Sequence, residues 1–151
     1  MMKHLVISLF IIAGFGPFAQ AQNAQEEVEA AIYQLFDGMR AGDSSKVHAV
    51  FSDKVAFYTS TVREGKAMLF EGSLARFLKS VGSPHDKVFD ERISQLQIHV
   101  DDNLATAWMN YSFYLGENFS HCGINTMTFH KEKEGWKMIF LADTRRKENC
   151  D

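Results

Sequence analysis

The chain has 151 residues and a formal net charge of −3 at pH 7, with 19 acidic side chains against 16 Lys and Arg. This length is enough for one domain with its own hydrophobic core. A mildly acidic chain lacks the basic surface that nucleic-acid-binding proteins use, so we expect no nucleic-acid partner.

The first residues are typical of a secretory signal peptide. A short basic start, Met1–His4, precedes an apolar run over Leu5–Ala19, and Ala19 and Ala21 fit the small-residue positions of a cleavage site. The apolar run is too short for a comfortable membrane span. We therefore predict a signal peptide over residues 1–21 and a mature domain over residues 22–151. The mature protein is expected to be periplasmic or secreted, with no membrane association.

Two helices are predicted at the start of the mature chain. The first is indicated by apolar residues at helical spacing: Val28, Ala31, Ile32, Leu35, Phe36 and Met39. Gly42 is expected to end this helix. Asp43 or Ser44 can cap a second, short helix. Both helices have an apolar side that must be covered.

A strand, an irregular segment and a third helix are predicted next. The sequence VAFYTS, residues 55–60, is typical of a strand, and residues 61–72 contain two glycines and are expected to be irregular. Ser73 can cap a helix with Leu74, Phe77, Leu78 and Val81 on one side, and Gly82 and Pro84 are expected to end it.

From Val88 onward the pattern is that of β-structure. Leu96, Ile98 and Val100 alternate, but Ile93 has the wrong parity, so a bulge is expected near Ser94. Further strands are predicted over residues 104–115, 119–130 and 135–143. Short connections make these four strands an antiparallel meander.

The order of these elements predicts an α+β fold. A long sheet must bury one face, and the amphipathic helices are the available cover. A curved antiparallel sheet wrapped over the N-terminal helices leaves a cone with one open end. Such a cone is a natural small-molecule cavity.

The turn between the second and third strands of the meander decides which side chains share a face. A two-residue turn, at Gly116–Glu117 or Glu117–Asn118, pairs even positions of residues 104–115 with odd positions of residues 119–130. One face would then carry Trp108, Asn110 and Tyr114 beside His121 and Asn125. A three-residue turn would reverse the matching, because a slip of one residue exchanges the faces of a strand.

Residues of the last strand complete the predicted pocket. If the turn around Glu132–Glu134 keeps odd positions beside odd positions, Leu141, Asp143 and Arg145 join the face of His121 and Asn125. Apolar walls with a few polar groups are typical of a specific pocket. The opposite face is smoother and suits a dimer contact or a solvent-facing side.

His121 and Asp143 are the candidate catalytic residues. Asp143 could orient His121 for proton transfer, Arg145 could hold an anionic group of a ligand, or Asp143 and Arg145 could pair with each other at the sheet edge. His121 could also be a histidine whose hydrogen bonds are satisfied within the fold. We leave these alternatives open and expect no metal and no cofactor, because the sequence contains no zinc-binding or phosphate-binding motif.

The two cysteines, Cys122 and Cys150, form an even pair in a chain predicted to be exported. Such a pair suggests a disulfide, which would close a loop of about 27 residues and contribute roughly 3–4 kcal/mol. The alternative is two separate thiols.

The order of elements resembles the nuclear-transport-factor-2-like superfamily, also called SnoaL-like. So do RAGDSSKVHAVFSDKVAFY, residues 40–58, and GINTMTFHKEKEGWKMIF, residues 123–140. The combination FSHCG…GWK…DTRRKENC is similar to secreted bacterial members labelled "putative lumazine-binding". The resemblance implies a cone-shaped, cystatin-like α+β roll that is usually dimeric. It also implies that the first strand borders the cavity, which makes Tyr58 a pocket candidate.

The superfamily includes ketosteroid isomerase, and the chain departs from that enzyme's pattern. The positions similar to its general base, its protonated acid and its oxyanion tyrosine are filled by Tyr58, Asn125 and Leu35. Because that proton shuttle needs a carboxylate base and strong acidic donors, ketosteroid isomerisation is not expected.

We therefore expect an exported, homodimeric small-molecule-binding protein. The predicted ligand-binding residues are Tyr58, Trp108, Asn110, Tyr114, His121, Asn125, Asp143 and Arg145. Two alternatives remain: a metal-independent isomerase, dehydratase or hydrolase-type enzyme that uses His121 and Asp143, and an interaction module that dimerises through the smoother face.

Overall fold

A computed structural model describes residues 17–150 of the chain. Of the predicted signal peptide, residues 1–16 lie outside the described residues, so this segment stays a prediction. The described elements are α1 (Pro17–Ala41), α2 (Ser44–His48), β1 (Phe51–Arg63), β2 (Lys66–Glu71), α3 (Leu74–Gly82), β3 (Phe89–Asp101), β4 (Leu104–Leu115), β5 (Asn118–Glu132) and β6 (Gly135–Arg145). Within this range, no helix combines the length and apolar character needed to cross a bilayer.

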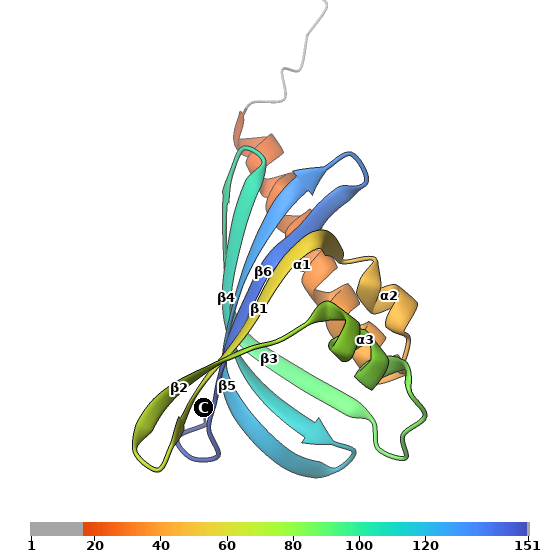
Figure 1. The fold of residues 1–151 in the computed structure, drawn as a ribbon. Helices are drawn as coiled ribbons and strands as arrows, with labels where there is room; N and C mark the ends of the chain where they lie inside the picture. Colours follow the sequence, from red (N-terminus) through yellow and green to blue (C-terminus); the bar gives the residue numbers. More distant parts are fainter. Residues whose placement is uncertain (1–16, 151) are drawn as a thin grey trace, which may run out of the picture.

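The strands form a single curved sheet in the order β2-β1-β6-β5-β4-β3. The predicted meander of β3 to β6 is confirmed, and β1 runs parallel to β6 while the other neighbours are antiparallel. Figure 1 shows the three helices gathered on one side of the twisted sheet. The predicted α+β cone is thereby confirmed.

The core lies between α1 and the inner face of the sheet. The helical stripe predicted from the sequence is buried, with Val28 and Ile32 fully enclosed. It packs in one cluster with sheet residues such as Met109, Phe129 and Met138. Because about 25 cal/mol is gained per Å² of apolar surface removed from water, this contact is the main term that holds α1 on the sheet.

The predicted helix caps are confirmed. The Asp43 carboxylate accepts hydrogen bonds from the backbone N–H groups of Ser45 and Lys46 and begins α2. Ser73 Oγ accepts from the backbone N–H of Arg76, at 3.2 Å, and begins α3. These caps satisfy N–H groups that have no partner within a helix. They fix where α3 begins beside the open end of the cone.

The segment predicted to be irregular is a β-hairpin. β1 continues to Arg63, Glu64 and Gly65 form the turn with φ of 51° and 73°, and β2 returns to Glu71. Positive φ at both central residues is the geometry of a type I′ turn. The prediction was wrong because both faces of this hairpin are exposed, so its side chains carry no alternation of apolar and polar residues.

The bulge predicted near Ser94 is confirmed. The pairing of β3 with β4 shifts by one residue between Ser94 and Gln97, and Gln95 has a φ of 53°. The extra residue restores the parity that Ile93 violates. Ile93 and Leu96 therefore both pack against the core.

The predicted matching of faces between β4 and β5 was wrong. The connection is the expected two-residue turn, with Leu115 opposite Asn118, but Ser120 is an extra residue in β5. Beyond this bulge odd positions pair with odd positions, so Met109 lies opposite Asn125 and Tyr111 opposite Gly123. A one-residue bulge exchanges the faces of a strand just as a three-residue turn would.

The inner face therefore carries other residues of β4 than predicted. Met109 and Tyr111 are buried there, whereas Trp108 is 51% exposed on the outer face. Asn110 and Tyr114 share the parity of Trp108. The expected match of β5 with β6 is present, but the turn does not produce it. Glu132 lies opposite Gly135, and an extra residue at Ile139 then restores the match, so that Asn125 lies opposite Asp143 and Met127 opposite Leu141.

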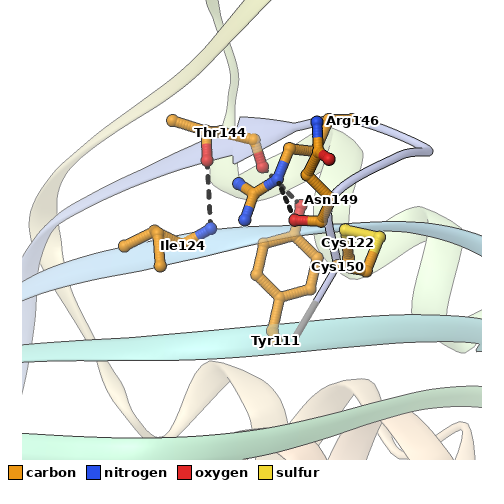
Figure 2. The surroundings of a disulfide bond; sticks show 7 residues. All are labelled: Tyr111, Cys122, Ile124, Thr144, Arg146, Asn149 and Cys150. Carbon is orange, nitrogen blue, oxygen red and sulfur yellow. Dashed lines mark hydrogen bonds between the residues drawn. A yellow bond between two sulfur atoms is a disulfide. The ribbon is translucent and has the colours of Figure 1, made fainter.

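The C-terminal segment is tied to the sheet. Cys122 and Cys150 form a disulfide with their Cα atoms 5.8 Å apart, as predicted. Cys122 and Arg146 also exchange two backbone hydrogen bonds of 2.9 Å, and Arg146 Nε donates to the carbonyl of Asn149 (Figure 2). The tail is thus an ordered extension of β6 rather than a loose end.

Candidate functional site

A cavity of about 310 Å³ lies between the inner face of the sheet, α1 and α3. Its apolar wall includes Leu35, Phe36, Met39, Phe57, Phe77, Met127 and Leu141. Its polar lining includes Thr59, Glu91, Tyr111, His121, Asn125, Asp143 and Arg145. A mostly apolar hollow with a few convergent polar groups is the usual form of a small-molecule site.

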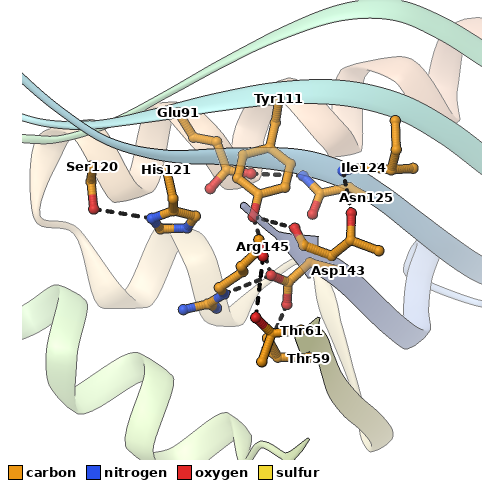
Figure 3. A network of polar contacts seen from close by, with 11 residues as sticks. Thr59, Thr61, Glu91, Tyr111, Ser120, His121, Ile124, Asn125, Asp143 and Arg145 are labelled. Atoms are coloured by element: carbon orange, nitrogen blue, oxygen red, sulfur yellow. Dashed lines mark hydrogen bonds and ion pairs between the residues drawn. The ribbon is translucent and has the colours of Figure 1, made fainter. Parts of the chain in front are cut away.

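Asp143 is the centre of the polar cluster. Thr59 Oγ1 donates to one carboxylate oxygen at 2.6 Å, and Arg145 Nε donates to the other at 2.7 Å (Figure 3). The Tyr111 hydroxyl lies 3.2 Å from the second oxygen. The Asp143 side chain is only 12% exposed. Charge-assisted hydrogen bonds of this kind hold a buried carboxylate in one orientation.

Tyr111 connects this cluster to the backbone of β6. Its hydroxyl lies 2.8 Å from the carbonyl oxygen of Thr144, a shorter contact than the one to Asp143. Burial raises the pKa of Tyr111 above its ordinary value, and the charges of Asp143 and Glu91 add to the increase. Tyr111 therefore remains a neutral hydrogen-bond donor.

Gly123 allows β6 to approach this point. A Cβ atom at Gly123 would lie 1.8 Å from the carbonyl oxygen of Thr144 and 2.9 Å from the Tyr111 ring. No side chain fits at such distances. The absence of a side chain at Gly123 thus lets Thr144 come within hydrogen-bond reach of Tyr111.

Glu91 and Asn125 form the second polar pair. Asn125 Nδ2 donates to Glu91 Oε1 at 2.7 Å, and Asn125 is only 4% exposed. Burial raises the pKa of Glu91 from 4.5 to about 7, and the charge of Asp143 adds to the increase, while Asn125 and Arg145 oppose it. Near neutral pH this carboxyl group exists in both protonated and ionised forms, so it can donate or accept a proton.

His121 does not form the predicted dyad with Asp143. Its Nδ1 lies 3.0 Å from Ser120 Oγ, and its ring packs against the rings of Tyr111 and Phe113. Asp143 instead pairs with Arg145, which was the alternative in which these two residues satisfy each other. Burial lowers the pKa of His121, and the charge of Arg145 lowers it further. His121 is therefore mainly neutral at pH 7.

The structure brings together about half of the residues predicted for the pocket. His121, Asn125, Asp143 and Arg145 all line the cavity. Tyr58 also borders it, but its ring packs against that of Phe140, 6.0 Å away, on the outer face of the sheet.

The predicted pocket residues of β4 lie elsewhere. The Ser120 bulge places Trp108, Asn110 and Tyr114 on the outer face, where the Tyr114 ring packs against Phe119. These three residues are therefore not part of the cavity.

Thr59, Glu91 and Tyr111 were not predicted as pocket residues from the sequence. Glu91 has the parity of Phe89 and Ile93, which pack against the core. A single acid at an apolar-facing position was the available signal for it. Tyr111 was assigned to the opposite face because the bulge at Ser120 was not anticipated.

Comparisons with known proteins agree with this fold. Residues 23–140 match the protein family described as "Putative lumazine-binding". No protein among the curated sequences matches this chain significantly.

Many solved structures share the fold. One is a nuclear-transport-factor-2-like protein with a cystatin-like fold from Novosphingobium aromaticivorans, with a TM-score of 0.67 and 12% identity over 89% of this chain and 93% of that one. Another, from the same organism, is the β subunit of a "putative aromatic-ring-hydroxylating dioxygenase", with a TM-score of 0.69 and 13% identity over 85% and 92% of the two chains.

A third is a "putative dehydratase" from Streptomyces avermitilis, with a TM-score of 0.61 and 14% identity over 83% of this chain and 98% of that one. Identities this low establish a common fold and leave activity open. The family match shows that the chain belongs to the "Putative lumazine-binding" family, and the solved structures show that it has the nuclear-transport-factor-2-like fold.

Proposed function

We propose that this protein binds a small organic molecule in the cavity beneath α1 and α3. The observation that carries this proposal is the division of the cavity wall. One part is apolar, with Leu35, Phe36 and Met39 of α1, and the other holds the polar clusters around Asp143 and Glu91. A volume of about 310 Å³ suits a molecule of one to three rings rather than a polymer.

The polar clusters indicate what kind of head group fits. The Asp143 carboxylate already accepts from Thr59 and Arg145, whereas Glu91 Oε1 accepts from Asn125 at the inner wall of the cavity. Because the pKa of Glu91 is about 7, its carboxyl group can donate to a ligand carbonyl or accept from a ligand N–H. The ligand is therefore expected to be a largely apolar ring compound with a hydrogen-bonding edge. Lumazine, which the family description names, has such an edge.

We also propose that the protein is exported and dimeric. The signal-like sequence of residues 1–21 and the Cys122–Cys150 disulfide both support an oxidising compartment outside the cytoplasm. The outer face of the sheet exposes Trp108 and Phe119, and large aromatic residues are enriched in protein interfaces. Light scattering coupled to gel filtration tests the dimer, and Trp108→Lys should convert it to a monomer.

Binding can be tested with N-phenyl-1-naphthylamine, a neutral aromatic probe that fluoresces in apolar surroundings. It is excited beyond the tryptophan absorption band, so an added Trp does not interfere. Leu141→Trp fills the cavity and should weaken probe binding at least about tenfold, because the added ring takes the space of the ligand. Phe140→Trp changes the neighbouring residue, which packs against Tyr58 instead of facing Met127, and is the matched control.

Three results would contradict the binding proposal. In the first, the probe shows no fluorescence increase with the wild-type protein. In the second, Leu141→Trp and Phe140→Trp weaken probe binding equally. In the third, Leu141→Trp loses the circular dichroism signal of the folded protein but still binds the probe. Lumazine, titrated by its own fluorescence, serves as a second probe that carries the hydrogen-bonding edge.

A second candidate function is acid–base catalysis, and the state of Glu91 favours it. A carboxyl group with a pKa of about 7 inside an apolar cavity is suited to transfer protons at neutral pH. The reacting carboxyl group would then be Glu91, with Asn125 and Tyr111 as hydrogen-bond donors, rather than the His121–Asp143 pair. Loss of turnover in Glu91→Gln, with ligand binding retained, would support catalysis once a substrate is found.

A further inference from the structure

A second hollow adjoins the cavity at the C-terminal end of β6. This groove, of about 560 Å³, shares Thr59, His121 and Arg145 with the cavity lining. Its other lining residues come from the β1–β2 hairpin, from Ser120 and from the segment after β6. Figure 1 shows the C-terminus lying beside this hairpin. The cavity and the groove are therefore neighbours that share these three side chains.

The groove is strongly cationic although the chain as a whole is acidic. Within residues 17–150, its lining contains Arg63, Arg145, Arg146 and Lys147 and no Asp or Glu. The formal charge of the whole chain is −3. The gathering of four cations at one place is therefore opposite in sign to the protein's average, and clefts lined by one sign of charge concentrate ligands of the other sign.

The cationic side chains of this groove are only partly neutralised by other groups of the protein. Arg145 pairs with Asp143 through Nε, yet its side chain is 51% exposed. Arg63 lies over the ring of Phe70, 5.0 Å from its centroid, and Arg146 Nε donates to the neutral carbonyl of Asn149. Burial, Arg145 and Lys147 all lower the pKa of His121, while Asp143 opposes them. Among the described residues, the groove lining therefore carries an excess of positive formal charge.

The backbone that carries Arg145, Arg146 and Lys147 is held in place by the rest of the fold. The backbone hydrogen bonds between Cys122 and Arg146, together with the Cys122–Cys150 disulfide, hold the segment after β6 against β5. Thr61 Oγ1 donates to the carbonyl of Arg145 and links the same segment to β1. A binding site that is already ordered does not lose affinity to the cost of ordering it.

We infer that this groove binds an anionic group, such as a carboxylate, sulfonate or phosphate, carried by the same molecule whose apolar part occupies the cavity. The inference rests on the proposed function and adds the charge of the ligand to it. The protein would thus select amphipathic organic anions over neutral ring compounds of the same size.

Two fluorescent probes that differ by one sulfonate group test the inference. N-phenyl-1-naphthylamine is neutral, and 1-anilinonaphthalene-8-sulfonate is the same ring system with the anion added. Arg63→Gln combined with Lys147→Gln should lower the affinity for the sulfonate about fivefold more than the affinity for the neutral probe. Lys133→Gln removes the same kind of charge from the β5–β6 turn and should leave the ratio of the two affinities unchanged.

Competition with methanesulfonate tests whether the groove binds an anionic group as part of a larger molecule or binds a free anion. If the groove recognises the charge as part of one molecule, a tenfold excess of methanesulfonate over the sulfonate probe leaves that probe bound, because the tethered charge has the higher effective concentration. Displacement of the probe at that excess would reveal a site for free anions and would overturn the inference.

The remaining outcomes separate this inference from the proposed function. If the neutral probe binds but the double variant leaves the ratio of affinities unchanged, the groove has no part in recognition and only this inference fails. If the neutral probe does not bind the wild-type protein, both proposals fail. A melting curve of the double variant that matches the wild type shows that any lost affinity does not come from unfolding.

Discussion

Replacing Glu91 by Gln should stabilise the protein, and only above pH 5. The pKa of Glu91 is raised from 4.5 to about 7 in the folded state, mainly by burial. The folded protein therefore binds a proton that the unfolded chain releases between these two pH values. Stability falls as the pH rises through this window and is then constant.

The size of the effect follows from the difference in pKa. A difference of about 2.5 pH units, at about 1.4 kcal/mol per unit, gives a cost of about 3 kcal/mol above pH 7. Glu91→Gln carries no charge at any pH, and its amide oxygen can still accept the hydrogen bond from Asn125. The variant should therefore gain about 3 kcal/mol in the free energy of unfolding at pH 8 and less than about 1 kcal/mol at pH 5.

Urea unfolding at pH 5 and pH 8, followed by circular dichroism, measures this difference. Glu134→Gln is the matched control, because this residue is exposed in the turn before β6 and should change stability little at either pH. The reasoning would be refuted if Glu91→Gln gave the same change at both pH values, or if it destabilised the protein at pH 8.

Two further predictions concern the C-terminal end of the sheet. Reduction of the Cys122–Cys150 disulfide should lower the free energy of unfolding by roughly 3–4 kcal/mol. A melting temperature that dithiothreitol leaves unchanged would contradict the presence of this disulfide. Gly123→Ala should cost about 2–4 kcal/mol, because its Cβ would lie 1.8 Å from the carbonyl oxygen of Thr144. At Gly65 nothing lies within 4 Å of the added Cβ, so Gly65→Ala should cost only about 1 kcal/mol for its positive φ. If chemical denaturation showed that Gly123→Ala and Gly65→Ala lower the free energy of unfolding equally, the close approach at Gly123 would be refuted.

The fold was predictable wherever the signal was local. Asp43 and Ser73 begin helices because their side chains reach backbone N–H groups two or three residues away. The wrong parity of Ile93 revealed the first bulge for a similar reason, since an apolar residue out of step with its neighbours needs an extra residue to reach the core. Such features depend on a few consecutive residues, which the sequence displays directly.

The bulge at Ser120 had no such local signal. Serine fits equally well on either face of a strand, so its neighbours Phe119 and His121 show no violation of the alternating pattern. The consequence is large, because this one residue moves Trp108 out of the cavity and Tyr111 into it. Sequence alternation alone therefore could not decide the face of β4.

The polar clusters were only partly predictable, because residues that are far apart in the sequence become neighbours only when the sheet forms. Asn125 and Glu91 are separated by 34 residues, and Thr59 and Asp143 by 84. Asp143 and Arg145 were recognised because they lie two residues apart on one strand. Glu91 acquires its raised pKa only from the enclosure that α1 and the curved sheet create around it.

The most direct test of the central claim is a methyl spectrum recorded during titration with a ligand. The protein is labelled with ¹³C at methionine methyl groups and with ¹⁵N at the tryptophan indoles, and is titrated with N-phenyl-1-naphthylamine. Met39 and Met127 line the cavity, whereas Met68 is exposed on β2. We expect the Met39 and Met127 resonances to shift by ring currents, while those of Met68 and of the Trp108 indole stay in place. A shift at Met68 or Trp108, with Met39 and Met127 unchanged, would place the ligand outside the cavity and contradict the account.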